Sequence, residues 1–291
     1  MACYHPIEIG VPKDSPHGNG RKIWVAQTVP CGNCKGCRAK QARDWAFRIL
    51  HETQMHSSAW FLTLTYDDES IPQHGSLFPE DLQIFFKSMR RDYPPKSISY
   101  FACGEYGSVT KRPHYHAVLY GLDLLDKRPA PSNSRHPVWR SPTLETYWPH
   151  GHSEFSSVTP GSASYVAGYV QKKISKAAHP EAYTRVDPET GELVELHQEF
   201  SRMSRRPAIG LRWIEKFWRD VYPRDFVVMK GREYKPPRFY DKWMEKNHPK
   251  IMADVKAKRD SEAVWLPPEK LTAKEKIHNS RDALYTQRAK I

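Results

Sequence analysis

The stretch Arg112-Pro113-His114-Tyr115-His116-Ala117-Val118-Leu119-Tyr120 decides the fold of this chain. It predicts a β-strand at 114–122, and an apolar run predicts another strand at 98–105. The loop between the two strands is short, so we expect them to pair as a hairpin. Successive side chains of a strand point to opposite faces, so His114 and His116 project the same way. The hairpin therefore sets two imidazoles side by side on one face of a sheet.

Helices and further strands are expected on both sides of this hairpin. A buried strand at 60–66 lies between two predicted helices, at 35–55 and 77–91, where apolar residues recur at helical spacing. A strand near 152–158 leads to a helix that we expect to begin at Ser162, a residue type favoured at helix N-caps. Strands and helices in this succession predict an α+β fold, with a sheet covered by helices.

The remaining segments divide the chain into three parts. Shorter expectations are a strand at 22–29, a surface excursion at 124–142, a polar loop at 176–198, a helix at 209–221 and a strand at 226–229. Beyond Pro236-Pro237 the chain is highly charged and permissive for helix. We therefore expect a Cys-rich N-terminal element with a helix at 1–56, a core at 57–240, and a charged, mainly helical tail at 241–291.

The composition points to a soluble protein with a polyanionic partner. Among 291 residues there are 45 Lys and Arg against 33 Asp and Glu, a net charge of +12. Basic surface gains affinity for nucleic acid by releasing counterions, although a merely soluble basic protein would share this balance. No stretch approaches the roughly 20 apolar residues that span a bilayer, and residues 1–10 lack the apolar core of a signal peptide. We expect no membrane partner and a location in the cytoplasm.

The hairpin carries a candidate metal site. Glu105 ends the first strand, so the short loop should place its carboxylate beside His114 and His116. Imidazole and carboxylate ligands suit several divalent ions, and phosphoryl chemistry commonly uses Mg²⁺ or Mn²⁺. A pair of histidines on a strand is by itself more often structural. The carboxylate on the partner strand favours a metal.

A second pattern, Tyr165-Val166-Ala167-Gly168-Tyr169, supplies candidate nucleophiles. Residues four apart lie on one helical face, so the two phenols should stand together, with Lys172 and Lys173 close beyond them. A free tyrosine has a pKa of about 10, so a phenol needs an activated phosphate and help in losing its proton. Alternatively, both tyrosines pack in an amphipathic helix.

Three of the five cysteines are crowded into one loop, as Cys31, Cys34 and Cys37. Cys3 or His5 could supply a fourth ligand. Thiolates at this spacing favour a closed structural zinc site, and an iron-sulfur cluster or three reduced thiols are the alternatives. An odd count does not fit a secreted disulfide framework. Cys103 falls within a strand pattern and is predicted to be a core residue.

These residues together resemble a known superfamily. Glu105, His114-Tyr115-His116 and Tyr165-x3-Tyr169-x2-Lys172-Lys173, in this order, resemble the HUH endonucleases that initiate rolling-circle replication. The chain is most similar to the replication initiators of gokushoviruses, a branch of the microviruses, which are small single-stranded DNA phages. Supporting motifs are Pro30-Cys31-Gly32-x-Cys34-x2-Cys37-Arg38, Phe61-Leu62-Thr63-Leu64-Thr65-Tyr66, Gly104-Glu105-Tyr106-Gly107 and Met203-Ser204-Arg205-Arg206-Pro207-x-Ile209-Gly210. The resemblance covers about 3–240.

The resemblance implies a fold and a set of roles. It implies a central antiparallel sheet flanked by helices, the HUH endonuclease fold, with 61–66 as the first motif strand. It implies that His114 and His116 bind the ion, with Glu105 as third ligand. His74, His150 and His152 are substitutes for that third ligand. It also implies that Tyr165 and Tyr169 are paired nucleophiles, assisted by Lys172 or Lys173.

The implied activity is metal-dependent nicking and joining of single-stranded origin DNA through a 5′-phosphotyrosine link, in the cytoplasm of a bacterial host. No Walker-type loop appears, so a helicase and a polymerase would come from the host. Candidate DNA-binding residues are Arg112, Tyr115, Arg205 and Arg206. Two rivals remain: a zinc-containing nucleic-acid-binding protein without catalysis, and an HUH transposase or relaxase.

Overall fold

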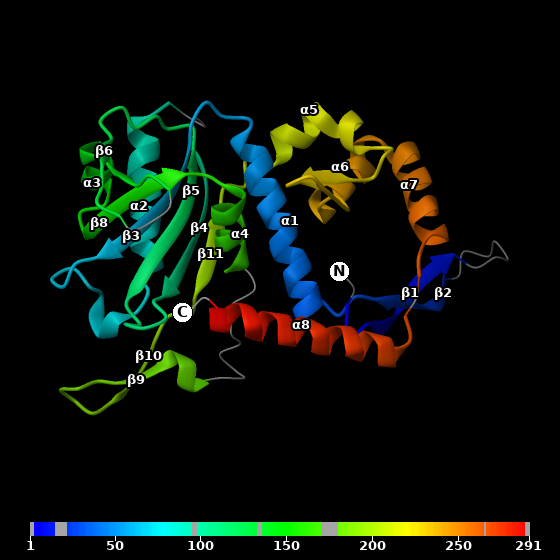
Figure 1. The fold of residues 1–291 in the computed structure, drawn as a ribbon, viewed down its shortest axis with the longest axis horizontal. Coiled ribbons are helices and arrows are strands. Elements are labelled where there is room, and N and C mark those ends of the chain that lie inside the picture. The colour runs from blue at the N-terminus through cyan, green and yellow to red at the C-terminus, as the bar shows by residue number, and fades with distance from the viewer. Residues whose placement is uncertain are drawn as a thin grey trace. The chain divides into compact units, whose positions relative to one another are not determined.

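A seven-stranded antiparallel sheet forms the centre of the computed structural model, in the order β11-β4-β5-β3-β8-β7-β6 (Figure 1). Its strands are β11 (Phe200–Met203), β4 (Ser99–Tyr106), β5 (Pro113–Tyr120), β3 (Ala59–Tyr66), β8 (Gly151–Ser157), β7 (Trp139–Arg140) and β6 (Arg128–Pro129). The structure describes residues 3–14, 22–94, 98–132, 136–169, 180–264 and 266–288. The sheet and its helices confirm the predicted α+β fold.

Side chains alternate along each strand, so the two faces of the sheet form two separate cores. On one face Leu62, Leu64 and Ala117 pack against α2 (Pro79–Asp92) and α3 (Pro142–Tyr147). On the other, residues of β4 and β5 pack against α1 (Lys35–Thr53) and α4 (Pro160–Gly168). The histidines of β5 point to this second face. The sheet therefore holds its polar site beneath α1 and α4.

A third cluster of buried residues joins three later helices to α1. The helices are α5 (Leu211–Val221), α6 (Arg238–Asn247) and α7 (Pro249–Ser261), with a small hairpin of β12 (Val227–Met229) and β13 (Arg232–Tyr234). Phe47 of α1 is 1% exposed in this cluster, together with Trp213 and Tyr240. The helical spacing of Trp213 predicts a packing residue, and the cluster confirms it.

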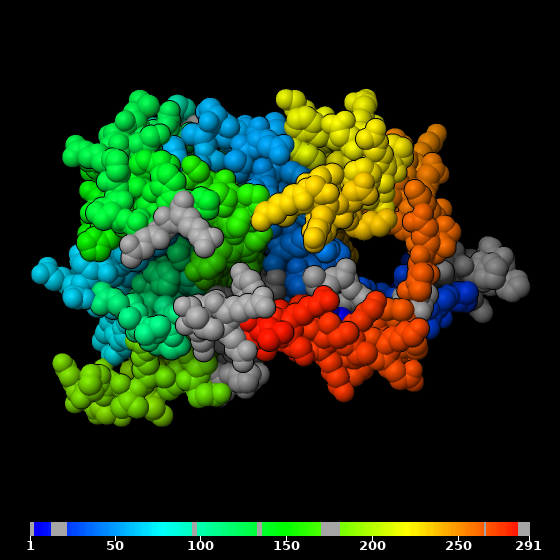
Figure 2. All heavy atoms as spheres, viewed as in Figure 1, coloured from blue at the N-terminus to red at the C-terminus, as the bar shows by residue number. Residues whose placement is uncertain are grey.

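The contacts divide the chain into two units, Ala42–Ala257 and the two terminal segments Met1–Gln41 and Lys258–Ile291. The boundaries expected at 57 and 240 stay a prediction. In the terminal unit β1 (Ile7–Asp14) pairs with β2 (Lys22–Val29), followed by the cysteine loop, the first turns of α1, and α8 (Pro268–Arg288). Most residues of α8 are exposed, as its red surface in Figure 2 shows. No helix in the described ranges is long and apolar enough to cross a membrane.

The helix that carries the tyrosines begins earlier than expected. Its N-cap is Thr159, whose Oγ1 accepts a hydrogen bond from the Ser162 amide at 3.1 Å. The Ser162 hydroxyl in turn accepts from the Thr159 amide at 2.8 Å, which completes a capping box. The expectation that Ser162 is the N-cap is therefore wrong. Pro160 explains the difference, because proline is favoured at the first helical position.

Two expected loops contain strands. The polar composition of 176–198 predicts a loop, but in its described part β9 (Thr184–Val186) pairs with β10 (Leu193–Glu195). The Asp187 carboxylate accepts hydrogen bonds from the Glu189 and Thr190 amides at 2.8 and 2.9 Å, which closes the turn between them. The excursion at 124–142 adds β6 and β7 to one edge of the sheet.

Candidate metal and nucleophile site

The register of the β4–β5 hairpin places the three predicted ligands together. Glu105 lies directly opposite His114, and Cys103 lies opposite His116. In an antiparallel pair, directly opposed side chains share a face and stand about 5 Å apart at Cβ. His116 is two residues from His114 and so lies on that face. The sheet brings a carboxylate and two imidazoles to one place without help from any loop.

A single oxygen is the focus of this cluster. Oε1 of Glu105 lies 2.9 Å from Nε2 of His114 and 3.0 Å from Nε2 of His116. All three side chains are largely buried, with exposed fractions of 6%, 18% and 9% respectively. Hydrogen bonds from the two histidines outweigh the effect of burial and hold the pKa of Glu105 well below its usual range. The carboxylate is therefore an anion in spite of its burial.

The other ring nitrogens of the histidines are oriented by neighbours. Nδ1 of His114 lies 3.2 Å from the Arg112 carbonyl oxygen, which can only accept, so this nitrogen carries a proton. Nδ1 of His116 lies 3.1 Å from the Thr63 hydroxyl. Metal-bound histidines almost always have such a partner on the second nitrogen. This leaves Nε2 of each ring directed at Glu105, where a proton or a cation must balance the carboxylate.

These distances suit a divalent ion. Metal–ligand bonds of about 2.1 Å at right angles separate two ligand atoms by about 3.0 Å, close to the Nε2–Oε1 distances here. Nitrogen and oxygen ligands of this kind accept Mn²⁺ and also suit Mg²⁺ through the carboxylate. The residues Glu105, His114 and His116 thus form a group that could hold one ion, with ligand atoms within 4.8 Å of one another.

Both tyrosines reach the same carboxylate. Tyr165, on α4, donates a hydrogen bond from its hydroxyl to Oε1 of Glu105 at 3.0 Å, and 45% of the residue is exposed. Tyr169 follows the last residue of α4, is 5% exposed and is also hydrogen-bonded to Glu105. The two phenol rings meet edge to face at 5.0 Å, and His116 lies 5.1 Å from the Tyr165 ring. Two phenols and a candidate ion site therefore share one point.

The surroundings of the phenols keep them protonated. Burial, followed by the nearby Glu105 charge, raises the pKa of Tyr165 to about 12. Burial and the hydrogen bond with Glu105 raise the pKa of Tyr169 well above its usual range. At neutral pH a reaction through either oxygen therefore needs a group that takes the proton as the oxygen–phosphorus bond forms.

Several other predicted residues lie elsewhere. Lys172 and Lys173 lie outside the described residues. Within the described ranges, no third histidine joins the cluster. His74 pairs with Asp187 at 2.9 Å, and His150 lies 3.7 Å from Asp81. His152 contributes its backbone carbonyl to a hydrogen bond from Thr65. Glu105 is thus the carboxylate that accompanies the two histidines in the structure.

The candidate DNA-binding residues have different surroundings. Arg112 pairs with Asp68 at 2.6 Å and donates to the Tyr66 carbonyl, next to the metal cluster in sequence. Arg205 and Arg206 are exposed. Tyr115 has no exposed surface, and its hydroxyl bonds to Tyr66 and to the Phe78 backbone. A buried ring is not available to stack on a base, so Tyr115 belongs to the core.

Thr63 and Phe61 are site residues that the sequence reasoning missed. Phe61 stacks on the His116 ring at 5.5 Å, and Thr63 faces Nδ1 of the same ring. Both lie on β3, opposite Val118 and His116 of β5. The alternation of the predicted strand at 60–66 was the available signal, because it puts Phe61 and Thr63 on one face. Its pairing with β5 could not be read from the alternation.

The cysteines form a second cluster, within the terminal unit. Cys3, Cys31, Cys34 and Cys37 bring their sulfur atoms within 4.8 Å of one another. The fourth member is Cys3, while His5 pairs with Glu275 at 2.8 Å. Cys103 is fully buried in β4, as expected of a core residue.

Comparison with known proteins identifies the family. The family model for the replication-associated protein ORF2 matches residues 59–174. Replication-associated protein VP4 of Bdellovibrio phage phiMH2K is 32% identical over 276 residues, which cover 89% of this chain and 82% of the relative. Replication-associated protein ORF2 of Spiroplasma virus 4 is 29% identical over 84% of this chain and 81% of the relative.

A third relative covers less of its own length. Replication-associated protein ORF4 of Chlamydia phage 1 is 26% identical over 75% of this chain and 54% of the relative. No solved structure matches the chain significantly. The matches extend well beyond the sheet and the tyrosine helix. The chain therefore belongs to the family of phage replication-associated proteins, in the form found in gokushovirus-like phages.

Proposed function

We propose that this protein initiates rolling-circle replication by nicking single-stranded origin DNA with a tyrosine and later rejoining the strand. Family membership supports a role in starting replication. The observation that carries the chemical proposal is that one carboxylate oxygen, Oε1 of Glu105, lies within hydrogen-bond distance of both imidazoles and of the Tyr165 hydroxyl. A nucleophile and a phosphate-activating site are then in contact.

In the nicking step, the Tyr165 oxygen attacks the scissile phosphorus. A phosphorus–oxygen bond to the phenol forms, the bond to the 3′ oxygen breaks, and that oxygen takes up a proton. The products are a 5′-phosphotyrosine and a free 3′ hydroxyl, with no change in the number of phosphodiester bonds. Tyr165 is the better candidate for this step, because nearly half of it is exposed while Tyr169 is almost buried.

Glu105, His114 and His116 would hold the divalent ion, which when bound supplies Lewis-acid polarisation of the phosphate. The protein's own groups do the rest. The Arg112 carbonyl and the Thr63 hydroxyl hold the two rings in position. The buried face of the sheet, under α4, limits the water that competes with the phenol.

Joining reverses the nick. The 3′ hydroxyl of the displaced strand attacks the phosphotyrosine, the bond to the phenol breaks, and the tyrosine is released. The energy of the original bond is kept in the phosphotyrosine, so no ATP is needed. Tyr169 shares the carboxylate with Tyr165, which would let one phenol hold a strand end while the other cuts.

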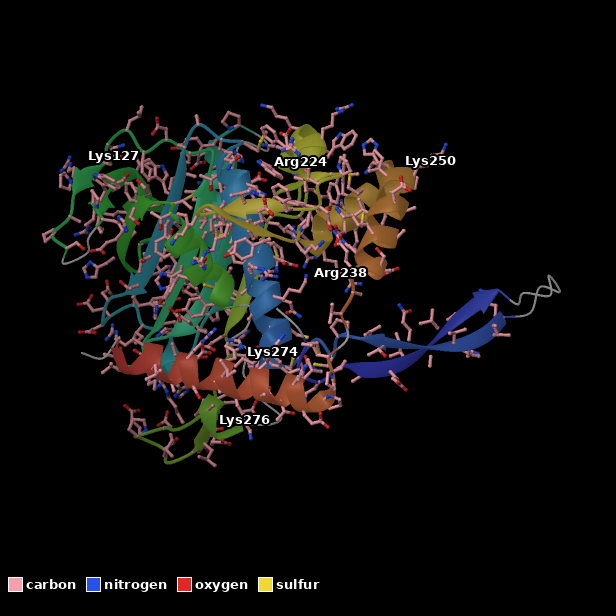
Figure 3. The ribbon with its side chains drawn as sticks, turned by 45° about the vertical axis from the view of Figure 1, so that its right-hand side comes forward. Lys127, Arg224, Arg238, Lys250, Lys274 and Lys276 are labelled. Atoms are coloured by element: carbon pink, nitrogen blue, oxygen red, sulfur yellow. The ribbon has the colours of Figure 1, made fainter. Side chains whose placement is uncertain are left out.

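Single-stranded DNA, or an origin hairpin, would be held by basic side chains. Exposed cations project from several elements, among them Lys127, Arg224, Arg238 and Lys250 in the larger unit (Figure 3). Arg112, Arg205 and Arg206 are the candidates from sequence. We place the activity in the cytoplasm of a bacterial host, with a host helicase and polymerase.

The test is a covalent adduct between the protein and single-stranded phage DNA. We expect the native chain with Mn²⁺ to give a species of reduced mobility on denaturing electrophoresis, sensitive to protease. The Tyr165→Phe, Tyr169→Phe double variant should lower its rate of formation by roughly three orders of magnitude or more. Tyr147→Phe is the matched control, because this phenol contacts Asp92 on the other side of the sheet.

The outcomes separate the rival functions. DNA binding without any adduct would favour a zinc-containing binding protein. An adduct that persists in the double variant would rule out both phenols as nucleophiles. An adduct formed without joining into circles would fit a relaxase or transposase that uses the same fold.

A further inference from the structure

The four cysteines of the terminal unit are arranged as ligands and not as disulfides. Sγ of Cys3 lies 3.6 Å from Sγ of Cys31 and 3.8 Å from Sγ of Cys34. A disulfide would bring two sulfurs to about 2.05 Å. Four sulfurs at about 2.3 Å from a tetrahedral ion stand about 3.8 Å apart. The measured separations are those of a tetrahedral thiolate site.

The backbone around the sulfurs is arranged to stabilise thiolates. The Tyr4 amide donates to Sγ of Cys34 at 3.3 Å, and the Cys34 amide donates to Sγ of Cys31 at 3.3 Å. The Cys31 amide donates to Sγ of Cys3 at 3.2 Å. Hydrogen bonds to ligating atoms hold the ligands in place and favour their charged form. Gly32, at a φ of +81°, allows the tight loop between Cys31 and Cys34.

Residues next to these cysteines hold α8. The Tyr4 hydroxyl lies 2.8 Å from Nδ1 of His278, and His5 pairs with Glu275 at 2.8 Å. Both follow Cys3 directly in sequence. Lys35, which follows Cys34, pairs with Asp282 at 2.6 Å and donates to Asn279 at 3.0 Å. The segments that carry the sulfurs are thus the same segments that contact α8.

We infer that Cys3, Cys31, Cys34 and Cys37 bind one structural zinc ion, which fastens the N-terminal segment and thereby docks α8. Binding displaces the remaining thiol protons and transfers no electrons. α8 is a charged helix that is mostly exposed, and such a helix depends on tertiary contacts for its stability. Without the ion, the segment at Cys3 loses its anchor and the contacts of Tyr4 and His5 with α8 are lost. This inference does not depend on the nicking reaction.

The first test is the metal content of the full-length protein. We expect about one zinc ion per chain, and a reduction of about fivefold or more in Cys34→Ser. Cys103→Ala is the matched control, since this thiol is buried in β4 outside the cluster, and it should keep its zinc. Cobalt exchanged into the native protein should give the intense visible absorption of tetrahedral cobalt thiolate. Absence of bound zinc, or iron with acid-labile sulfide in its place, would overturn the inference.

The second test uses the native chain, so it does not depend on whether a variant folds. Zinc is stripped with a chelator under reducing conditions, and amide hydrogen exchange is followed in α8 and, as an internal reference, in β4. We expect exchange in α8 to rise about tenfold or more and to be restored by added zinc, with β4 unchanged. Unchanged exchange in α8 after complete removal of zinc would show that the ion does not dock this helix.

Discussion

The two metal-ligand clusters of this protein are built in opposite ways. Glu105, His114 and His116 come together through the pairing of two strands, and their ligand atoms are nitrogen and oxygen. The cysteine cluster takes three sulfurs from the seven residues 31–37 and one from Cys3. One cluster depends on the register of a sheet, and the other on a local loop and a single distant residue.

The difference indicates different uses. Nitrogen and oxygen ligands numbering three leave coordination positions open for a phosphate, and a half-exposed phenol already touches this site. Four thiolates close the coordination of zinc and leave no position for a substrate. An open site suits chemistry, and a closed site suits the fastening of a segment that has little core of its own.

The largest expected effect breaks the open site alone. Glu105→Gln keeps the size of the side chain but removes the charge that faces both imidazoles. The initial rate of adduct formation, measured on denaturing gels, should fall by about 10²- to 10³-fold. Zinc content should stay as in the native chain. Glu145→Gln, which removes only a surface pair with Arg140, is the control. Loss of zinc from Glu105→Gln would mean that the two clusters are not independent.

A smaller effect is expected from the residue that orients one imidazole. Thr63→Val removes the hydroxyl next to Nδ1 of His116, and Mn²⁺ affinity should fall about 10- to 100-fold. A titration of the adduct rate with Mn²⁺ measures this, and Thr63→Ser should restore it. Thr65→Val, on the same strand, removes a hydroxyl that bonds to the His152 carbonyl instead. Equal effects of the two valine variants would count against an orienting role for Thr63.

A buried histidine away from both clusters sharpens the comparison through pH. His51 stacks on Trp213 at 3.5 Å, and burial lowers its pKa to about 3 from the usual 6.5. Below pH 6.5 the unfolded chain binds a proton at this position that the folded chain does not. This stabilising contribution is therefore complete above pH 6.5 and is lost as pH falls toward 3.

Urea unfolding at pH 7 and pH 5 measures this contribution. His51 should lower the free energy of unfolding by about 2 kcal/mol between these two values. In His51→Gln this share of the pH dependence should disappear, whatever the stability of the variant at pH 7. An unchanged slope in the variant would show that His51 does not titrate between the folded and unfolded states.

The smallest effect concerns the contact of α8 with the cysteine loop. Lys35→Ala removes the pair with Asp282, in which both side chains are partly exposed. Such pairs contribute about 0.5 kcal/mol, so amide exchange in α8 should rise about two- to threefold. Zinc content should not change, since no ligand is lost. A loss of zinc in this variant would place Lys35 in the metal site itself.

Local pattern was enough to predict most of the elements that form the larger unit. The strand at 60–66 and the helix at 77–91 differ from β3 and α2 by one or two residues. Local pattern was less informative at element ends and in polar segments. Pro160 moved the start of the tyrosine helix, and a turn at Asp187 made a hairpin from an expected loop. In both places a backbone hydrogen bond made by one side chain outweighed the average tendency of the segment.

The sequence by itself determined which groups are available for chemistry. His114 and His116 must share a face because the period of a strand is two residues, and the spacing of Cys31, Cys34 and Cys37 limits them to one small loop. Only the tertiary structure decided which partners these groups meet. The β4–β5 register set Glu105 opposite His114, the β3 pairing set Thr63 against His116, and the fold of the terminal unit chose Cys3 over His5. Such contacts join residues far apart in the chain, and packing of the whole unit, not local preference, selects among them.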